Sequence, residues 1–262
     1  MNNPDNQINE ESQIMNLIAD NEISILTTEK LLTLAGQDYM CLKPTLKKLV
    51  RNGQLFRIEK GLYCVRNFRN PNIIANALLA DSVVGYWTAL NMHNLTEQIP
   101  NTIYSLSTTS KNNKKVFNVR YKFIKVNANK VCGITHMGYG NESFRITDIE
   151  KTLLDCFDLP KYSGGYEELI RAFYNANISS TKLLSYGKQM NNLSVLKRLA
   201  FLSEIFEMKR FVVFQKEVFK MVNKRYTLLD PMGENDGEFN SKWRIRVNIQ
   251  KERLLGIINK LY

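Results

Sequence analysis

Apolar residues at helical spacing predict two helices near the start of the chain. A first helix is expected over 13–20, where apolar residues recur three and four positions apart. Thr27 or Thr28 is expected to cap the second helix, because a hydroxyl at that position accepts a bond from a free helix N–H. Gly36 follows this helix and is expected to end it in a left-handed conformation.

The third predicted helix has one apolar face and one basic face. It is expected to begin near Pro44, since a proline at the first helical position loses no hydrogen bond, and to end at Gly53. The apolar stripe consists of Leu42, Leu46, Leu49 and Val50. The opposite face is assigned the polar residues Thr45, Lys47, Lys48 and Arg51.

Two short strands follow the third helix and predict a hairpin. They cover 55–58 and 62–65, and Glu59-Lys60-Gly61 joins them with a glycine that supplies the positive φ of such a turn. Three helices and a hairpin make a winged helix-turn-helix, in which the third helix enters the major groove of DNA. Arg57 and Lys60 on the wing would then contact a phosphate or the minor groove. Two alternatives stay open, a solvated lysine-rich helix face and a protein-binding scaffold.

The composition shifts around 70–71 and divides the chain into two expected domains. The fold class is α+β, with the winged helix-turn-helix in 1–69 and a larger mixed α/β domain in 70–262. Its first part, 70–160, mixes helices and strands, and its second part, 161–262, is mainly helical with a late strand. The helices expected in the second part cover 167–174, 180–190, 195–206 and 212–222, and the strand covers 243–249.

A strand expected over 116–126 has two different faces. Its apolar face would carry Phe117, Val119, Tyr121 and Phe123, and its basic face Asn118, Arg120, Lys122 and, after a slip in the alternation, Lys125. A cationic sheet face suits nucleic acid or an acidic protein, although a solvated outer face has the same pattern.

The formal net charge of +11 favours an anionic partner. No Asp or Glu occurs between positions 98 and 141, so the excess is concentrated. The N-terminal residues lack the pattern of a signal peptide, and no apolar stretch is long enough to cross a bilayer. A cytoplasmic protein without a membrane partner is therefore expected.

Residues that carry catalysis are sparse. The four cysteines and two histidines do not have the spacing of metal ligands, so neither a metal site nor a cofactor is expected. Asp148, Glu150 and Asp155 suggest a metal-dependent nuclease, but Thr147 and Glu150 also form a capping box at a helix start. His93 is interpreted as a packed, hydrogen-bonded side chain. We expect no catalytic residue and no enzyme.

Three segments together resemble the AbiEi family of antitoxins. They are NGQLFRIEKGLY in the wing, GYWTALNMHNL in the middle of the chain and FRITDIEKTLLDCF before residue 160. The late segment WRIRVNI also looks like this family. The matching positions are Asn52, Gly53, Leu55, Arg57, Gly61, Tyr63, Ala89, Leu90, His93, Leu95, Ile146, Thr147, Lys151, Thr152, Leu153 and Asp155.

The resemblance implies an antitoxin of a type IV toxin–antitoxin system that acts in abortive infection and phage defence. It implies a transcriptional repressor that binds inverted repeats in its own promoter. It also implies a C-terminal domain that counteracts a nucleotidyltransferase toxin, without requiring a stable complex. The approach to the second motif, Tyr86-Trp87-Thr88, departs from the family pattern, and 163–232 matches none.

Basic residues in the larger domain form a second candidate surface, for antitoxin action or for nucleic acid. They are Lys122, Lys125, Lys209, Arg210, Lys216 and Lys220. The alternative functions are a winged-helix transcriptional regulator and an RNA- or protein-interaction scaffold, each without antitoxin activity.

Overall fold

The computed structural model of the chain describes residues 4–36 and 39–259, and it has an α+β fold. The chain forms two compact units. The first unit contains the residues up to Ala80 together with 115–119 and 136–144. The second unit contains 81–114, 120–135 and the residues from Arg145 onward. The division after residue 69 that the sequence suggested falls inside the first unit.

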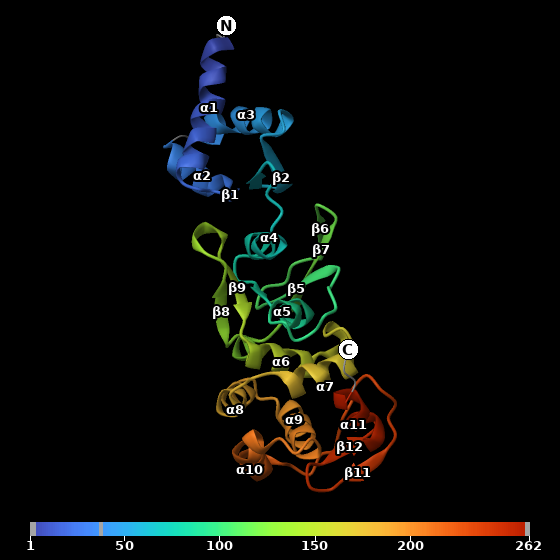
Figure 1. Cartoon of the computed structure of the whole chain (residues 1–262). Coiled ribbons are helices and arrows are strands. Elements are labelled where there is room, and N and C mark those ends of the chain that lie inside the picture. Colours follow the sequence, from blue (N-terminus) through green and yellow to red (C-terminus); the bar gives the residue numbers. More distant parts are fainter. Residues whose placement is uncertain (1–3, 37–38, 260–262) are drawn as a thin grey trace. The chain divides into compact units, whose positions relative to one another are not determined.

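The first unit has the element order of a winged helix (Figure 1). Its elements are α1 (Pro4–Asp20), β1 (Ile25–Thr27), α2 (Thr28–Ala35), α3 (Tyr39–Arg51), β2 (Leu55–Glu59), β3 (Leu62–Val65) and α4 (Pro71–Leu78). The three strands pair antiparallel in the order β1-β3-β2. The expected winged helix-turn-helix is thus present.

Local sequence signals explain where these elements end. Thr27 caps α2 by accepting a hydrogen bond from the backbone N–H of Lys30 at 3.1 Å, and Gly36 ends α2 with φ of 59°. Gly61 has φ of 79° in the hairpin that joins β2 to β3. The core beneath them is aliphatic and consists of Ile14, Ile18, Ile23, Leu26, Leu31, Leu42, Leu46, Leu49 and Leu55.

The predicted start of the third helix is wrong. Pro44 lies inside α3, which begins at Tyr39. Proline inside a helix removes one backbone hydrogen bond, so it is a costly residue at this place. Leu42 lies in the extra turn of helix before the proline and is fully buried, and this burial offsets the cost of the lost hydrogen bond.

The strand expected over 116–126 is two strands, β6 (Lys114–Val116) and β7 (Val119–Lys125). Phe117 and Asn118 have φ of 49° and 68°, which is the pattern of a two-residue hairpin with two left-handed positions. The ring of Phe117 packs edge-on against Phe56, and the guanidinium of Arg69 lies 4.1 Å from its centroid. Phe117 therefore belongs to a turn, not to an apolar strand face.

β6 and β7 belong to a six-stranded mixed sheet with the order β6-β7-β5-β4-β9-β8. The remaining strands are β4 (Val83–Val84), β5 (Thr102–Ser107), β8 (Ile134–Met137) and β9 (Phe144–Thr147). β5 pairs parallel with β7, and β4 pairs antiparallel with β5 and parallel with β9. Asp81 fixes the chain beyond β5 because one of its carboxylate oxygens accepts hydrogen bonds from Ser107, Thr108 and Thr109.

Helices make up most of the second unit (Figure 1). They are α5 (Tyr86–Met92), α6 (Ile149–Asp158), α7 (Tyr166–Asn175), α8 (Ser180–Gln189), α9 (Leu193–Ile205), α10 (Val212–Met221) and α11 (Lys251–Asn259). Short 3-10 turns cover Ala128–Lys130, Pro160–Tyr162 and Lys209–Phe211 in this unit, and Gly140–Glu142 in the first unit. A small sheet contains β10 (Thr227–Leu228), β11 (Glu238–Asn240) and β12 (Ile245–Val247). The four helices predicted between 167 and 222 are confirmed within two residues at each end.

The predicted capping box at the start of α6 is wrong. Asp148 is the N-cap and accepts a hydrogen bond from the backbone N–H of Lys151 at 2.9 Å. Thr147 is the last residue of β9, and its hydroxyl lies 2.7 Å from that of Thr152. Glu150 instead accepts bonds from the backbone N–H of Ser179 and from Lys182, so it ties α6 to the start of α8.

α6 carries a buried ion pair between Lys151 and Asp155, whose side chains are 0% and 2% exposed. Burial raises the pKa of Asp155 to about 6, although the Lys151 ammonium acts to lower it. The second carboxylate oxygen of Asp155 has no hydrogen-bond partner among the described residues. A single contact, between the Lys151 ammonium and one carboxylate oxygen of Asp155, therefore holds the pair, and both side chains are buried.

Removal of one member of this pair is expected to be more harmful than removal of both. Lys151→Met leaves a buried carboxylate without its counter-ion and should lower the free energy of unfolding by about 3–5 kcal/mol at neutral pH. Lys151→Met with Asp155→Leu removes both charges and should cost less than Lys151→Met alone. Urea denaturation of both variants measures the difference.

The loss of stability caused by Lys151→Met should depend on pH. The pKa of Asp155 is raised in the folded state, so this group favours folding at low pH and loses that contribution as the pH rises towards about 6. The deficit of Lys151→Met should therefore shrink as the pH falls. A deficit that is independent of pH would contradict the buried carboxylate as its cause.

Candidate nucleic-acid interface

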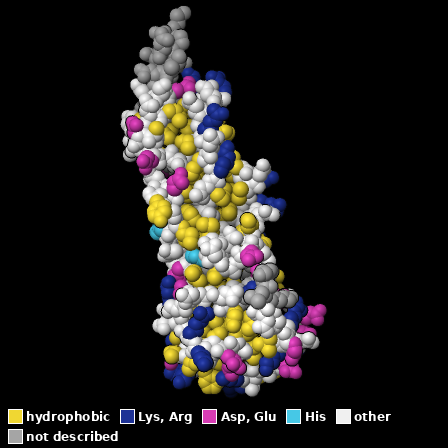
Figure 2. Space-filling model, viewed as in Figure 1, with side chains coloured by type: hydrophobic (Ala, Val, Ile, Leu, Met, Phe, Trp, Pro, Cys, Tyr) yellow, Lys and Arg dark blue, Asp and Glu magenta, His cyan; other side chains and the backbone are white. Residues whose placement is uncertain are grey.

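Charge is divided unevenly along the chain of the first unit. Residues 41–70 contain eight Lys and Arg but a single acidic residue, whereas residues 1–40 contain seven Asp and Glu but a single lysine. α3 and the β2–β3 hairpin come from the basic stretch, and α2 and β1 from the acidic one. Figure 2 shows Lys and Arg side chains along the side of this unit on which α3 lies. This side is suited to an anionic partner.

The exposed face of α3 is a single stripe along the helix. It contains Met40, Lys43, Pro44, Lys47 and Arg51, which recur at the spacing of one helix face. Met40 is 75% exposed, an unusual exposure for a side chain of this kind. The face thus presents three cations and one long apolar side chain to solvent.

Thr45 does not lie on that face, so its assignment to the exposed side is wrong. It is 5% exposed, and its hydroxyl donates a hydrogen bond to the Glu10 carboxylate of α1 at 3.1 Å. Position 45 lies three residues after Leu42 and four before Leu49, which places it on the buried side of the helix. Thr45 joins α3 to α1.

Lys48 lies at the border of the two faces and is half-buried. Asn52, four residues further along, donates a hydrogen bond to Glu11 of α1 at 3.0 Å. The exposed basic face is therefore centred on Lys47 and Arg51. Lys43 was not among the DNA-binding residues predicted from the sequence, although its position four residues before Lys47 indicates the same helix face.

The wing carries the other two predicted cations. Arg57 and Lys60 are both exposed. The side chain of Arg57 donates a hydrogen bond to the backbone carbonyl of Glu59 at 3.3 Å, and the ladder between β2 and β3 shifts register between these two residues. This irregularity bends the wing near its tip, where Gly61 completes the turn.

β7 presents only part of the expected basic face: Arg120 is exposed on it, but Lys122 and Lys125 do not extend it. Lys122 is half-buried, with its ammonium 4.8 Å from the centroid of the Tyr162 ring. Ile124, two residues along on the same face of the strand, is buried. Lys125 is exposed at the end of the strand and points to the other face.

The remaining four candidates lie at and after the 3-10 turn before α10. Lys209 and Lys216 are exposed. Arg210 donates hydrogen bonds to the carbonyls of Tyr174 and Ala176, so it caps the end of α7. Lys220 forms an ion pair with Glu217 at 2.5 Å. Two of the four cations thus have local roles.

The side chains that suggested catalysis have structural partners. His93 lies with Nε2 2.7 Å from the carbonyl oxygen of Thr147, as expected for a packed histidine. Among residues 4–36 and 39–259, no cluster of three His, Cys, Asp or Glu side chains has the arrangement of a metal site. No helix in the same ranges is both long and apolar enough to cross a membrane.

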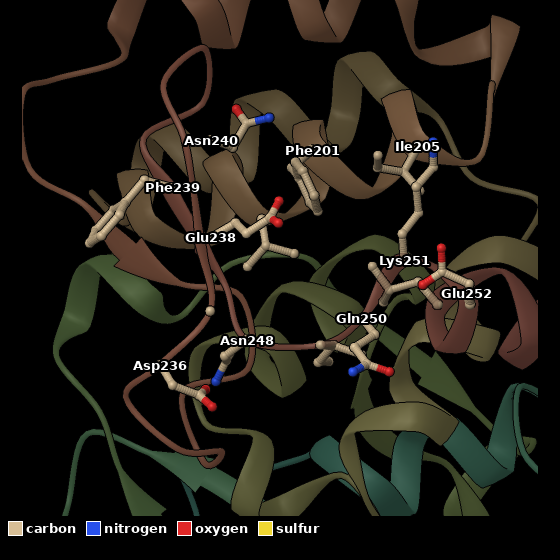
Figure 3. Close-up of a pocket in the computed structure, with 14 residues that line it drawn as sticks. Phe201, Ile205, Asp236, Glu238, Phe239, Asn240, Asn248, Gln250, Lys251 and Glu252 are labelled. Atoms are coloured by element: carbon tan, nitrogen blue, oxygen red, sulfur yellow. The ribbon is translucent and has the colours of Figure 1, made fainter.

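A pocket of about 680 Å³ opens in the second unit between α9 and the small sheet (Figure 3). Phe201 and Ile205 of α9 form an apolar part, and Asp236, Glu238 and Glu252 supply carboxylates. Lys251 is the single cation among the residues that line it. This pocket has an acidic character and is poorly suited to nucleic acid.

Comparisons with known proteins support the fold. No family model matches the chain, and no curated protein matches it in sequence. The crystal structure of the RV2827C protein from Mycobacterium tuberculosis is similar, with a TM-score of 0.64 and 14% sequence identity. The similarity covers 95% of this chain and 94% of that chain, so the two share their fold over nearly the full length.

Replacement of Thr45 is expected to affect stability and not binding. Thr45→Val removes the hydrogen bond to Glu10 and should lower the free energy of unfolding by about 1 kcal/mol. Its affinity for duplex DNA should equal that of the unchanged protein. The matched variant Lys47→Ala should instead keep its stability within about 0.5 kcal/mol. Urea denaturation and fluorescence anisotropy measure the two properties, and weaker DNA binding by Thr45→Val would contradict its placement.

Proposed function

We propose that the first unit binds double-stranded DNA through α3 and the wing. The observation that carries this proposal is the exposed stripe of Lys43, Lys47 and Arg51 on the third helix of a winged helix-turn-helix. In such folds the third helix enters the major groove, and its cations neutralise backbone phosphates. Arg57 and Lys60 on the wing would bind the adjacent backbone or minor groove.

Met40 gives the helix an apolar contact near its start. Residues near the start of a recognition helix meet base edges in the major groove. The thymine methyl group is the one apolar feature on those edges, and an exposed methionine side chain suits it. The cations would therefore set affinity, while Met40 would contribute to the choice of sequence.

The second part of the proposal concerns biological role. The protein would be an antitoxin of the AbiEi type that represses its own operon by binding promoter inverted repeats. It would act in the cytoplasm, without catalysis, and would counteract a nucleotidyltransferase toxin through its second unit. Support comes from the three motifs, which lie in the wing, in α5 and the residues after it, and in β9 and α6.

Two of these motifs support each other in the fold. His93, from the second motif, contacts the carbonyl of Thr147, from the third motif. Lys151 and Asp155, also from the third motif, form the buried pair of α6. These residues of the second and third motifs thus stabilise the second unit, as expected of residues that maintain a family fold. The proposed functional surface is formed by other residues.

Charge reversal on α3 tests the DNA-binding proposal. Five phosphate contacts predict that log affinity falls with log salt concentration with a slope of about −4.5 on duplex DNA. Lys47→Glu with Arg51→Glu should weaken binding more than tenfold and make the slope shallower by about 2. The measurement is fluorescence anisotropy with a duplex from upstream of the protein's own gene, over a range of salt concentrations.

A matched control separates this site from general basicity. Lys209→Glu with Lys216→Glu makes the same change of charge in the second unit and should leave duplex affinity within about twofold, because phosphate contacts act locally. Equal losses in the two double variants would overturn the winged-helix site.

Co-expression tests the antitoxin role separately. A nucleotidyltransferase encoded beside this chain should arrest growth when expressed alone, and the full-length chain should restore growth. Lys47→Glu with Arg51→Glu should still restore growth from an independent promoter, since antitoxin action is assigned to the second unit. Growth arrest that persists with the unchanged chain would refute the antitoxin role while leaving DNA binding intact.

A further inference from the structure

One face of the small sheet in the second unit gathers exposed aromatic rings and half-buried guanidinium groups. Arg246 of β12 pairs in register with Phe239 of β11, and Arg244 lies opposite Tyr226, just before β10. The contacts among their side chains place these four residues on the same face, although Arg244 itself lies in the turn before β12 with φ of 52°. Phe239 is 61% exposed and Tyr226 is 39% exposed. We refer to Tyr226, Phe239, Arg244 and Arg246 as the aromatic platform.

The four side chains of the aromatic platform contact one another in sequence. The rings of Tyr226 and Phe239 meet edge to face with centroids 4.8 Å apart. Arg244 lies 5.3 Å from the centroid of Tyr226 and donates a hydrogen bond to its hydroxyl at 3.0 Å. Arg246 lies 5.1 Å from the centroid of Phe239. Each ring is thus joined to a cation at the surface.

Buried cations of α9 hold the backbone beneath the platform. Lys197 is 1% exposed, and its ammonium donates hydrogen bonds to the carbonyls of Arg225 and Arg244 at 2.7 and 3.4 Å. Burial lowers the pKa of Lys197, so its enclosure is costly. Arg198 donates to the carbonyl of Leu228 at 2.9 Å. These bonds fix the backbone of the β10 edge and of the turn that leads into β12.

The two faces of the small sheet differ in charge. Glu238 and Phe239 extend to opposite sides of β11, and the carboxylate of Glu238 points into the acidic pocket, although Phe239 is also among the residues that line it (Figure 3). Lys224 and Arg225 are exposed immediately before Tyr226. Glu234 and Asp236, in the loop before β11, offset part of this charge. The platform combines stacking surface with a moderate excess of cations.

We propose that the aromatic platform binds unpaired bases of a single-stranded nucleic acid. An exposed ring offers a stacking surface for a base, and the adjacent guanidinium groups reach the phosphates on either side. A duplex hides the faces of its bases, so it cannot use these rings. An acidic protein would use the cations but has no need of two exposed aromatic rings.

This inference is independent of the proposed winged-helix function, because the two sites lie in different units and use different chemistry. The winged-helix site is charge-driven and steeply dependent on salt. Two phosphate contacts at the aromatic platform would give a slope of only about −1.4 for a single strand. The two sites are therefore distinguishable in one salt titration.

The test uses the full-length chain with Lys47→Glu and Arg51→Glu, so that the duplex site is silenced. Fluorescence anisotropy measures binding of a labelled oligonucleotide of about ten nucleotides, as RNA and as DNA, with the matching duplex as competitor. Tyr226→Ala with Phe239→Ala should weaken single-strand binding at least tenfold, since each stacked base contributes about 1–3 kcal/mol. Tyr226→Phe with Phe239→Tyr should retain binding within about threefold, because the rings remain.

Tyr139→Ala is the matched control, because Tyr139 is an aromatic residue of the first unit that is 93% exposed. It should not change single-strand affinity. Preference for RNA would add a contact to the 2′-hydroxyl, and equal binding of RNA and DNA would assign recognition to the bases alone; both results support the platform.

Two results would overturn the proposal. One is undiminished binding by the double alanine variant, and the other is equal affinity for single strand and duplex in the silenced background. Circular dichroism checks that the variants are folded. If the double variant unfolds, the single variant Phe239→Ala replaces it in the single-strand binding measurement, because the more exposed ring contributes least to packing.

Discussion

The enclosure of α6 is the constraint on which the second unit depends. Every residue from Glu150 to Phe157 is buried, including both members of the Lys151–Asp155 pair. The polar groups of a helix that is enclosed all round need partners within the fold, because each unpaired buried group is costly; one carboxylate oxygen of Asp155 has none among the described residues. Asp148 caps its start, Glu150 binds the start of α8, and His93 binds the preceding strand. The neighbouring elements are thus placed by the polar requirements of one helix.

Local patterns were sufficient to predict the first unit because its elements are short and consecutive. Thr27, Gly36 and Gly61 each act through the backbone of their own turn, so their effects can be inferred without tertiary information. Thr45 shows the limit of that approach. A threonine suits either face of a helix, and only the carboxylate of Glu10 on α1 determines its orientation. The polarity of its side chain alone therefore predicted the wrong helix face for Thr45.

The second unit was harder to predict because many of its charges have partners within the same unit. Arg210 and Lys220 are exposed, as predicted, yet Arg210 caps α7 and Lys220 pairs with Glu217 at the surface. Lys197 and Arg198 lie in an apolar helix and bind carbonyls from a distant sheet. The aromatic platform depends on the register of three short strands, and sequence periodicity does not determine which strands pair.

The similarity to the mycobacterial structure describes the fold of this chain. The motif residues His93, Thr147, Lys151 and Asp155 all have partners in the interior. Residues with partners in the interior maintain a fold, and one fold supports many functions. The functions that we propose rest instead on exposed side chains whose identity the fold does not dictate. The basic stripe of α3 and the aromatic platform meet this condition, since neither is needed to close a core.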